Sequence, residues 1–241
     1  MFRTALIYDF DGTLSPVAMQ QHTLIPALGF DSVGEFWDEV KRRTKEVDGD
    51  EILTYMHYLL EPSRDNITAS LLRKHGKDLP FFEGVETWFG RINEYGAQRG
   101  LSIEHYIISS GLREMIEGSS IFSAFRHVFA SKYAYDGDVP KWPAVAINYT
   151  NKTQYLFRIN KGIDNSWDDE SVNSYIPMDE RPLPFERMVF FGDGDTDIPT
   201  MKMLKYQGGT AIAVFDEIKF LGEHQSKVYK LIAEDRANYV C

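Results

Sequence analysis

The chain has 241 residues, of which 43% are hydrophobic and 26% are charged, and its formal net charge is -10. This length allows a sizeable core in one large domain, or in one domain that carries a smaller insertion. The negative charge argues against nonspecific binding to nucleic acid or to an anionic membrane surface, because such contacts need clustered Lys and Arg. The basic triplet Lys41-Arg42-Arg43 lies in a helical pattern and is interpreted as a solvated face.

Several features of the chain bear on its cellular compartment. The single cysteine, Cys241, allows no intramolecular disulfide and excludes a cysteine-based metal site. The start is unlike a signal peptide, because the short apolar stretch after Arg3 runs directly into acidic residues. No apolar run reaches the length of about 18 residues that a membrane span requires. We therefore expect a cytoplasmic protein with no membrane partner.

The hydrophobic pattern predicts strands that alternate with helices. Strands are expected at residues 3–9, 103–108, 188–191 and 211–215, with further apolar runs at 127–130 and 144–147. Helices are expected at about 112–118, at 151–160 with Thr150 as the N-cap, and after Pro199. This alternation implies crossover connections, and hence an α/β fold with a mainly parallel sheet.

Two segments interrupt the alternation. From about Pro16 to Glu83 the apolar residues recur at helical spacing, which predicts three or four helices. A further helix is expected near 64–75, ending with Gly76 as its C-cap. This block is therefore an insertion after the first strand. Residues 162–184 are polar, acidic and proline-punctuated, and we expect them to form a long loop of the kind that often lies over a site. The aromatic and Met residues of the block are interpreted as its own core, namely Trp37, Tyr55, Met56 and Tyr58.

Polar side chains follow three of the predicted strands at their carboxyl ends. They are Asp9 and Asp11, then Ser109 and Ser110, then Asp193, Asp195 and Asp197. Because a parallel sheet puts all its carboxyl ends on one side, these groups would share one rim. Several carboxylates in one crevice repel each other, and a hard divalent cation with oxygen ligands, such as magnesium, would resolve the conflict.

The acids at 193, 195 and 197 also have the spacing of a calcium-binding loop. The EF-hand pattern requires Gly at its sixth position and Glu at its twelfth, where this chain has Ile198 and Leu204. The sequence therefore disfavours a calcium loop.

Four motifs, taken in order, resemble those of the haloacid dehalogenase superfamily, in its phosphoserine-phosphatase-like branch. They are Asp9-Phe10-Asp11-Gly12-Thr13, Ser109, Lys152 and Gly192-Asp193-Gly194-Asp195-Thr196-Asp197. Thr196 departs from the pattern, because relatives often have Asn there. The resemblance implies a Rossmann-like three-layer core made of residues 1–15 and 84–241, with an inserted α-helical cap of the C1 type at residues 16–83.

The resemblance also implies roles for the polar residues in phosphate chemistry. Asp9 would be the nucleophile that forms an aspartyl-phosphate, and Asp11 would protonate the leaving alcohol and then activate water. Lys152 would hold Asp9 and the phosphate together, with Lys161 or Lys141 as the alternative cation. Relatives that cleave carbon–halogen bonds lack the second acid, so Asp11 favours a phosphatase.

Metal and phosphate ligands follow from the same resemblance. Magnesium would be held by the Asp9 carboxylate, the Asp11 backbone carbonyl and Asp193, with Asp197 nearby directly or through water. Asp195 is interpreted as a solvent-side acid. Phosphate would be bound by Thr13, the Ser109 hydroxyl and the amides of Ser110 and Gly111 at the start of a helix. Ser109 could instead be a helix N-cap, with Ser110 in its role.

The sequence thus predicts a magnesium-dependent phosphatase that acts on a small phosphorylated metabolite. Two alternatives stay open: a phosphotransferase or mutase on the same core, and a non-catalytic binding module, which would typically lack Asp9 or Asp11. The candidates for substrate contact are the loop at 162–184 and Gln20, Gln21, Arg42 and Arg43.

Overall fold

The computed structural model describes residues 1–61, 67–194, 196–216 and 231–241. Its strands form one sheet in the order β4-β3-β2-β1-β5-β6-β7. At the centre, β1 (Phe2–Tyr8) pairs in parallel with β2 (Leu101–Leu112) on one side and with β5 (Met188–Gly192) on the other. The chain therefore changes direction across the sheet at β1, and a crevice at such a switch point is where α/β folds bind ligands.

The outer strands complete this mainly parallel sheet and confirm the predicted α/β fold. They are β3 (His127–Asp136), β4 (Val139–Val145), β6 (Thr210–Ala213) and β7 (Tyr239–Val240). Only the β3–β4 pair is antiparallel among the described strands. The edge strand β4 contains Pro140 and Pro143, which an edge accepts because proline has no N–H to donate to a further strand.

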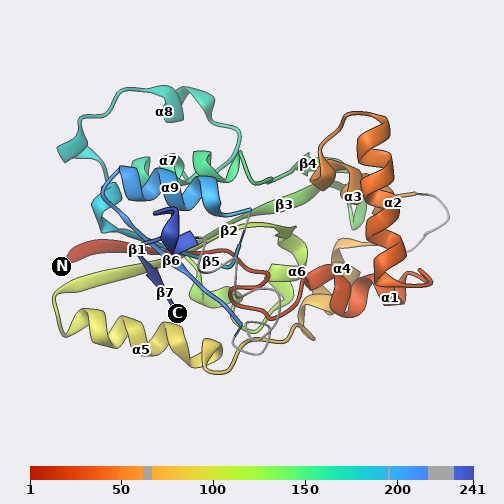
Figure 1. Cartoon of the computed structure of the whole chain (residues 1–241), viewed down its shortest axis with the longest axis horizontal. Helices are drawn as coiled ribbons and strands as arrows, with labels where there is room; N and C mark the ends of the chain where they lie inside the picture. The colour runs from red at the N-terminus through yellow and green to blue at the C-terminus, as the bar shows by residue number, and fades with distance from the viewer. Residues whose placement is uncertain (62–66, 195, 217–230) are drawn as a thin grey trace.

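Helices cover both faces of the sheet (Figure 1). One face carries α5 (Val85–Ala97) and α6 (Arg113–Gly118), and the other carries α7 (Lys152–Lys161) and α9 (Ile198–Tyr206). Successive residues of β1 point to opposite faces: Ala5 and Ile7 belong to the core under α7 and α9, while Leu6 and Tyr8 belong to the core that includes α5. The result is a three-layer core with β1 buried on both sides.

The described residues between β1 and α5 are mainly helical, as predicted, and lie to one side of the sheet (Figure 1). It contains a π-helical turn, η1 (Gln20–Leu24), and the helices α1 (Ile25–Ala27), α2 (Val33–Glu46), α3 (Glu51–Leu59) and α4 (Ala69–Gly76). Phe36 of α2 stacks on Tyr58 of α3 with ring centroids 5.4 Å apart. We call this segment the cap, and its proposed limits remain residues 16 and 83.

Two local predictions were wrong. Thr150 is not the N-cap of α7, because the helix begins after Asn151 and the Thr150 hydroxyl donates instead to the side chain of Asn148. Residues 162–184 are not all loop, since they contain α8 (Asp169–Asn173) and the 3-10 turn η4 (Met178–Glu180). Two further 3-10 turns, η3 (Phe122–Ala124) and η5 (Phe185–Arg187), precede β3 and β5. None of the described helices combines the length and apolarity that crossing a membrane would need.

Candidate active site

Asp9 is the first residue after β1 and lies at the carboxyl end of the sheet. Its N–H donates to the carbonyl of Phe191 in β5 at 2.9 Å, so its backbone continues the pairing of the sheet, and the residue is 5% exposed. The chain then turns at Gly12, where φ is 79°. Glycine is favoured there by the positive φ, and a Cβ at Gly12 would also lie 2.3 Å from Oδ2 of Asp193 and displace that side chain. The turn brings the first and fourth motifs into contact.

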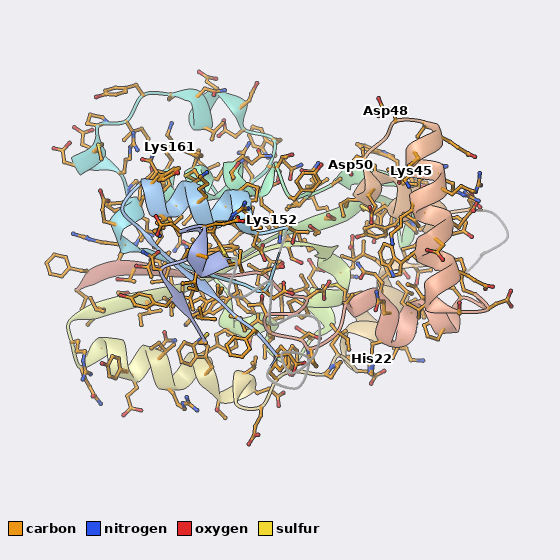
Figure 2. All side chains as sticks on the ribbon, in the orientation of Figure 1. His22, Lys45, Asp48, Asp50, Lys152 and Lys161 are labelled. Carbon is orange, nitrogen blue, oxygen red and sulfur yellow. The ribbon has the colours of Figure 1, made fainter. Side chains whose placement is uncertain are left out.

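Lys152, which Figure 2 labels, is the first residue of α7 and links two of the acids. Its Nζ lies 3.0 Å from Oδ1 of Asp9 and 2.8 Å from Oδ1 of Asp197, and the residue is 1% exposed. Burial by itself lowers the pKa of Lys152, but the nearby carboxylates of Asp197 and Asp9 outweigh it and raise that pKa above its usual value. The lysine is therefore a fixed buried cation between the end of β1 and the start of α9.

The carboxylates of Asp9, Asp193 and Asp197 form a cluster that could hold a metal ion. One ligand oxygen from each lies within 4.8 Å of the others. Burial, followed by the charge of Asp9, raises the pKa of Asp197, against the opposing effect of Lys152. Oδ2 of Asp197 is buried and has no hydrogen-bond partner in the described part of the chain. An unpartnered carboxylate oxygen beside two further acids fits a hard divalent cation.

Asp11 lies two residues after Asp9 and is held by the start of the cap. Its Oδ1 accepts a hydrogen bond from the N–H of Met19 at 2.9 Å. Burial, and next the charge of Asp9, raises the pKa of Asp11 well above its ordinary value. These surroundings favour the protonated carboxylic acid, which can donate a proton.

The predicted phosphate ligands lie near the end of β2, although not at the start of a helix as expected. Strand β2 continues to Leu112 and α6 begins only at Arg113, so the amides of Ser110 and Gly111 belong to the strand. Ser109 is not a helix N-cap either, because it lies within β2 and the N-cap of α6 is Leu112. Its Oγ accepts the N–H of Gly111 at 3.0 Å. A register shift after Ser109 accompanies this local bend.

Thr13 lies beside the acids on the turn after β1, and it is 6% exposed. Its hydroxyl is buried without a hydrogen-bond partner among the described residues. A buried hydroxyl in that state costs free energy, which a ligand could recover by bonding to it.

The alternative cations lie elsewhere. Lys161 donates to the carbonyls of Val172 and Ser174, each at 2.6 Å, and so ties the segment after α7 to that helix. Lys141 lies on β4, with its Nζ 3.7 Å from Oδ2 of Asp136. Of the three lysines considered, Lys152 is the one that contacts Asp9. Asp195 lies outside the described residues.

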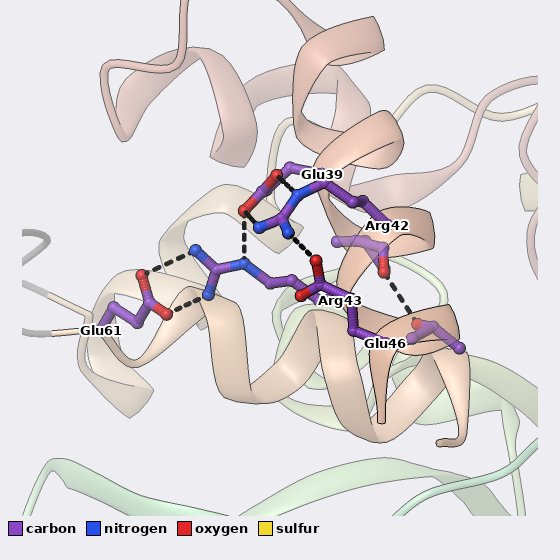
Figure 3. A network of polar contacts seen from close by, with 7 residues as sticks. Glu39, Arg42, Arg43, Glu46 and Glu61 are labelled. Atoms are coloured by element: carbon purple, nitrogen blue, oxygen red, sulfur yellow. Dashed lines mark hydrogen bonds and ion pairs between the residues drawn. The ribbon is translucent and has the colours of Figure 1, made fainter. Parts of the chain in front are cut away.

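Arg42 and Arg43, predicted as possible substrate contacts, are engaged within the cap (Figure 3). Both guanidinium groups bind Glu39, at 2.7 Å from Arg42 and 2.6 Å from Arg43. Arg42 also binds Glu46, and Arg43 also binds Glu61. The two arginines line an open groove of about 560 Å³ beside α2 and α3, with their charges already paired.

The remaining candidates for substrate contact are residues 162–184, Gln20 and Gln21. Arg158 of α7 donates to the carbonyls of Asn165 at 3.0 Å and Asp168 at 3.1 Å, so the segment after α7 packs against that helix. Gln20 is buried at the start of the cap, where its side-chain amide donates to the hydroxyl of Tyr55 at 3.4 Å. Gln21 is half-buried next to it.

Sequence reasoning missed two residues that contact the catalytic turns. Tyr55 was interpreted as cap core, yet its hydroxyl donates to the carbonyl of Ser110 at 3.0 Å. Asn148 was not singled out, yet its side chain organises the turn that leads to Lys152. The pairing of Asn148 with Thr150 was the available signal, because Asn side chains bond their own backbone two residues on.

Comparisons with known proteins agree with this geometry. The family described as haloacid dehalogenase-like hydrolase matches residues 6–202. An uncharacterized protein of Borreliella burgdorferi is 30% identical in an alignment 228 residues long, and the match covers 83% of this chain and 78% of that protein.

Solved structures share the fold at low sequence identity. A haloacid dehalogenase family hydrolase from Salmonella enterica serovar Typhi has a TM-score of 0.61 at 13% identity, over 98% of this chain and 66% of that one, slightly less than two thirds of its length. A phosphoserine phosphatase in its apo form has a TM-score of 0.60 at 14% identity, over 99% of this chain and 92% of that one. With the family match over most of its length, the chain belongs to the haloacid dehalogenase-like hydrolases.

Proposed function

We propose that the protein is a magnesium-dependent phosphatase that hydrolyses a small phosphorylated metabolite through an aspartyl-phosphate on Asp9. The observation that carries the proposal is the buried contact of one lysine with two acids, since Lys152 lies 3.0 Å from Asp9 and 2.8 Å from Asp197. A nucleophilic carboxylate needs such a cation, because a phosphate dianion would otherwise be repelled by the acids around it. The fold shared with phosphoserine phosphatases supports the same reaction class.

The first step breaks the ester bond. A carboxylate oxygen of Asp9 attacks phosphorus, the bond between phosphorus and the alcohol oxygen breaks, and the carboxylic acid of Asp11 gives its proton to that oxygen. The bond between Asp11 and the Met19 N–H keeps this acid in one orientation. The alcohol leaves, and the phosphoryl group stays on Asp9.

The second step restores the enzyme. Asp11, now a carboxylate, takes a proton from water as the water oxygen attacks phosphorus. The bond between phosphorus and Asp9 breaks, and inorganic phosphate leaves. Asp9 is again a carboxylate and Asp11 is again protonated, so the cycle closes without another reactant.

The cations and donors of the site would stabilise the charge that develops on the phosphoryl oxygens. Magnesium would be held by Asp9, Asp193 and the Asp11 carbonyl, with Asp197 nearby, and when bound it would neutralise part of that charge. Lys152 is the protein's own contribution, worth about 4 kcal/mol for one pair of unit charges at about 4 Å and an effective dielectric near 20. Ser109, the amide of Ser110 and Thr13 would donate to phosphate oxygens, while the N–H of Gly111 is used by Oγ of Ser109.

The test is release of phosphate from an aryl phosphate, measured with magnesium and with a chelator. The proposal expects activity in magnesium, none in chelator, and none in Asp9→Asn. Asp179→Asn, a change of the same kind at an exposed site, should keep full activity. Adding glycerol as a competing acceptor distinguishes hydrolysis from transfer, because a transferase would form glycerol phosphate in place of inorganic phosphate. Activity that is equal in Asp9→Asn, or indifferent to chelator, contradicts the proposal.

A further inference from the structure

Helix α3 of the cap and the residue before it make hydrogen bonds to the two backbone segments that present candidate catalytic groups. These are the turn before α7 and the bend after Ser109 in β2, and we call them the two turns. Oδ2 of Asp50, the residue before α3, accepts a hydrogen bond from Nδ2 of Asn148 at 2.6 Å. The hydroxyl of Tyr55 donates to the carbonyl of Ser110 at 3.0 Å. Asn148 is four residues before Lys152, and Ser110 follows Ser109 directly. Figure 2 labels Asp50 and Lys152, which come from the beginnings of α3 and α7.

Asn148 shapes the turn from which Lys152 projects. Its Oδ1 accepts the N–H groups of Thr150 at 3.0 Å and Asn151 at 2.9 Å, and also the Thr150 hydroxyl at 2.8 Å. Its backbone carbonyl accepts the N–H of Lys152 at 3.1 Å. With its oxygen used by the turn, the side chain has only its NH₂ group to offer, and that group is bound by Asp50.

Asp50 is fixed in turn by its own helix. Its Oδ1 accepts the N–H of Leu53 at 2.9 Å, so the carboxylate caps the N-terminus of α3. The second oxygen is the one that meets Asn148. One carboxylate therefore joins the first turn of α3 to the turn before α7, through a charge-assisted bond of the stronger kind.

Tyr55 acts on the other turn. The residue is 1% exposed, and its hydroxyl bonds one end of the peptide between Ser110 and Gly111. The N–H at the opposite end of that planar peptide donates to Oγ of Ser109 at 3.0 Å. Because Oγ accepts this N–H, the hydroxyl proton of Ser109 can point toward a phosphate oxygen.

We infer that Asp50 and Tyr55 are positioning residues, which set Lys152 and Ser109 for phosphoryl transfer when α3 docks on the core. The inference rests on the proposed function and deepens it. The cap then contributes to the reaction through these two contacts. A displacement on the order of 1 Å in either turn would be enough to slow the reaction by about a hundredfold.

The Asp50 contact is tested by exchanging its partners. In Asp50→Asn the remaining side-chain oxygen can still cap α3, but the new NH₂ group faces the NH₂ group of Asn148. The Asn148 side chain cannot flip to offer its oxygen, because that oxygen holds the turn before α7. We expect kcat/KM for an aryl phosphate to fall about tenfold, as loss of one charge-assisted bond implies. Asn148→Asp alone places two carboxylates next to each other, and its kcat/KM should be lower still. The double variant, Asp50→Asn with Asn148→Asp, restores donor and acceptor and should recover most of the activity.

The Tyr55 contact is tested by Tyr55→Phe, which removes only the hydroxyl. We expect inorganic phosphate, titrated by calorimetry in magnesium, to bind about tenfold more weakly. Tyr133→Phe is the matched control, because the Tyr133 hydroxyl donates to the carbonyl of Met56 in α3 at 2.8 Å and touches neither turn. Asp48→Asn, at an exposed residue between α2 and α3, is the control for Asp50. Both controls should bind phosphate nearly as wild type does.

The outcomes separate the inference from the proposed function. Wild-type protein that neither binds phosphate nor turns over an aryl phosphate overturns the proposed function, and this inference with it. Wild-type activity together with unchanged kcat/KM and phosphate affinity in Asp50→Asn and Tyr55→Phe overturns the inference alone. If kcat/KM of the double variant at 50 and 148 is no higher than that of its single variants, the inference is overturned for the Asp50 contact, even if all the variants fold less stably.

Discussion

At the scale of single residues, the balance of charge around Lys152 decides what the site can do. One buried cation faces the carboxylates of Asp9 and Asp197, and Asp193 lies within reach of both. Removing one partner of a buried ion pair leaves an uncompensated charge, which is far more costly than replacing the whole pair. The lysine therefore stabilises the fold as well as the proposed reaction.

Replacing the lysine should expose this double role. Lys152→Met is expected to lower the free energy of unfolding by about 3–5 kcal/mol in chelator, because the acids lose their buried partner. Magnesium should recover part of that loss, since a bound cation offsets the same charge. Urea unfolding in chelator and in magnesium measures both.

The matched control is Lys161→Met, which removes a lysine bonded to the carbonyls of Val172 and Ser174. Its stability change should be the same with and without magnesium. A Lys152→Met protein whose stability is indifferent to magnesium would contradict the metal cluster.

Thr13 offers a test that separates ligand binding from stability. Its buried hydroxyl has no partner among the described residues, so Thr13→Val removes the cost of burying it and should raise the free energy of unfolding by about 1 kcal/mol. Phosphate binding should nonetheless weaken, because the variant loses a donor to phosphate. Urea unfolding and phosphate titration on the same preparation decide this. Unchanged phosphate affinity would remove Thr13 from the site.

At the scale of elements, α4 and α6 pack closely enough that two glycines are required. A Cβ at Gly76 would lie 1.9 Å from the carbonyl oxygen of Met115, and a Cβ at Gly118 would lie 1.9 Å from the carbonyl oxygen of Arg73. The backbones themselves are in contact, so no side-chain movement could make room. This crossing fastens the last helix of the cap to the helix that follows β2.

Gly76→Ala should therefore destabilise the protein by about 3 kcal/mol, as overpacking of a close contact does. Gly90 is the control, because it lies in the exposed middle of α5 with open space around its Cα. Gly90→Ala should stabilise by about 0.5–1 kcal/mol through helix propensity. Thermal or urea unfolding of the two variants measures the contrast. Equal effects at 76 and 90 would show that the helices can separate freely.

Elements with strong local patterns were predictable, and those organised by distant partners were not. The apolar run at the start of the chain predicted β1, and Pro199 predicted α9, in whose first turn it lies. Helix α5 was overlooked, although Val85, Trp88 and Phe89 recur at helical spacing. Thr150 was predicted as the N-cap of α7 because Thr is a favoured N-cap residue. In the structure its hydroxyl donates to the Asn148 side chain instead, and local sequence preferences do not show which of these two bonds forms.

At the scale of the whole molecule, the central place of β1 explains why the acids of the site could be predicted together. Parallel pairing of β1 with β2 and β5 brings Asp9, Ser109 and Asp193 to one edge from distant parts of the chain. The cap contacts could not be predicted in this way. Tyr55 meets Ser110 through the packing of a helix on the core, and no strand order fixes which residue of that helix faces the site.

A buried histidine links overall stability to pH. His105 lies between the hydroxyl of Tyr8 at 3.1 Å and Oδ1 of Asn93 at 3.0 Å, and the Tyr8 hydroxyl also accepts the ring N–H of Trp88. Burial lowers the pKa of His105 to about 4. The unfolded chain, with a pKa near 6.5, therefore binds the proton first. The stability due to neutral His105 is complete above about pH 6.5 and is lost as pH falls toward 4.

The stability advantage of wild type over His105→Gln should thus shrink by about 2 kcal/mol between pH 7 and pH 5. Comparing the two proteins cancels the titration of the other groups. Urea unfolding at each pH gives the difference directly. A difference that is constant or grows as pH falls would mean that His105 is not held neutral.

The most direct test of the account is to look for the phosphoryl group on Asp9 during turnover. Wild-type enzyme mixed with an aryl phosphate and magnesium should be quenched in acid, digested and analysed by mass spectrometry. The account predicts a phosphorylated peptide containing Asp9, which borohydride reduces to homoserine at that position, and no such peptide without magnesium. Steady release of phosphate with Asp9 unmodified, or with the label on another residue, would contradict it.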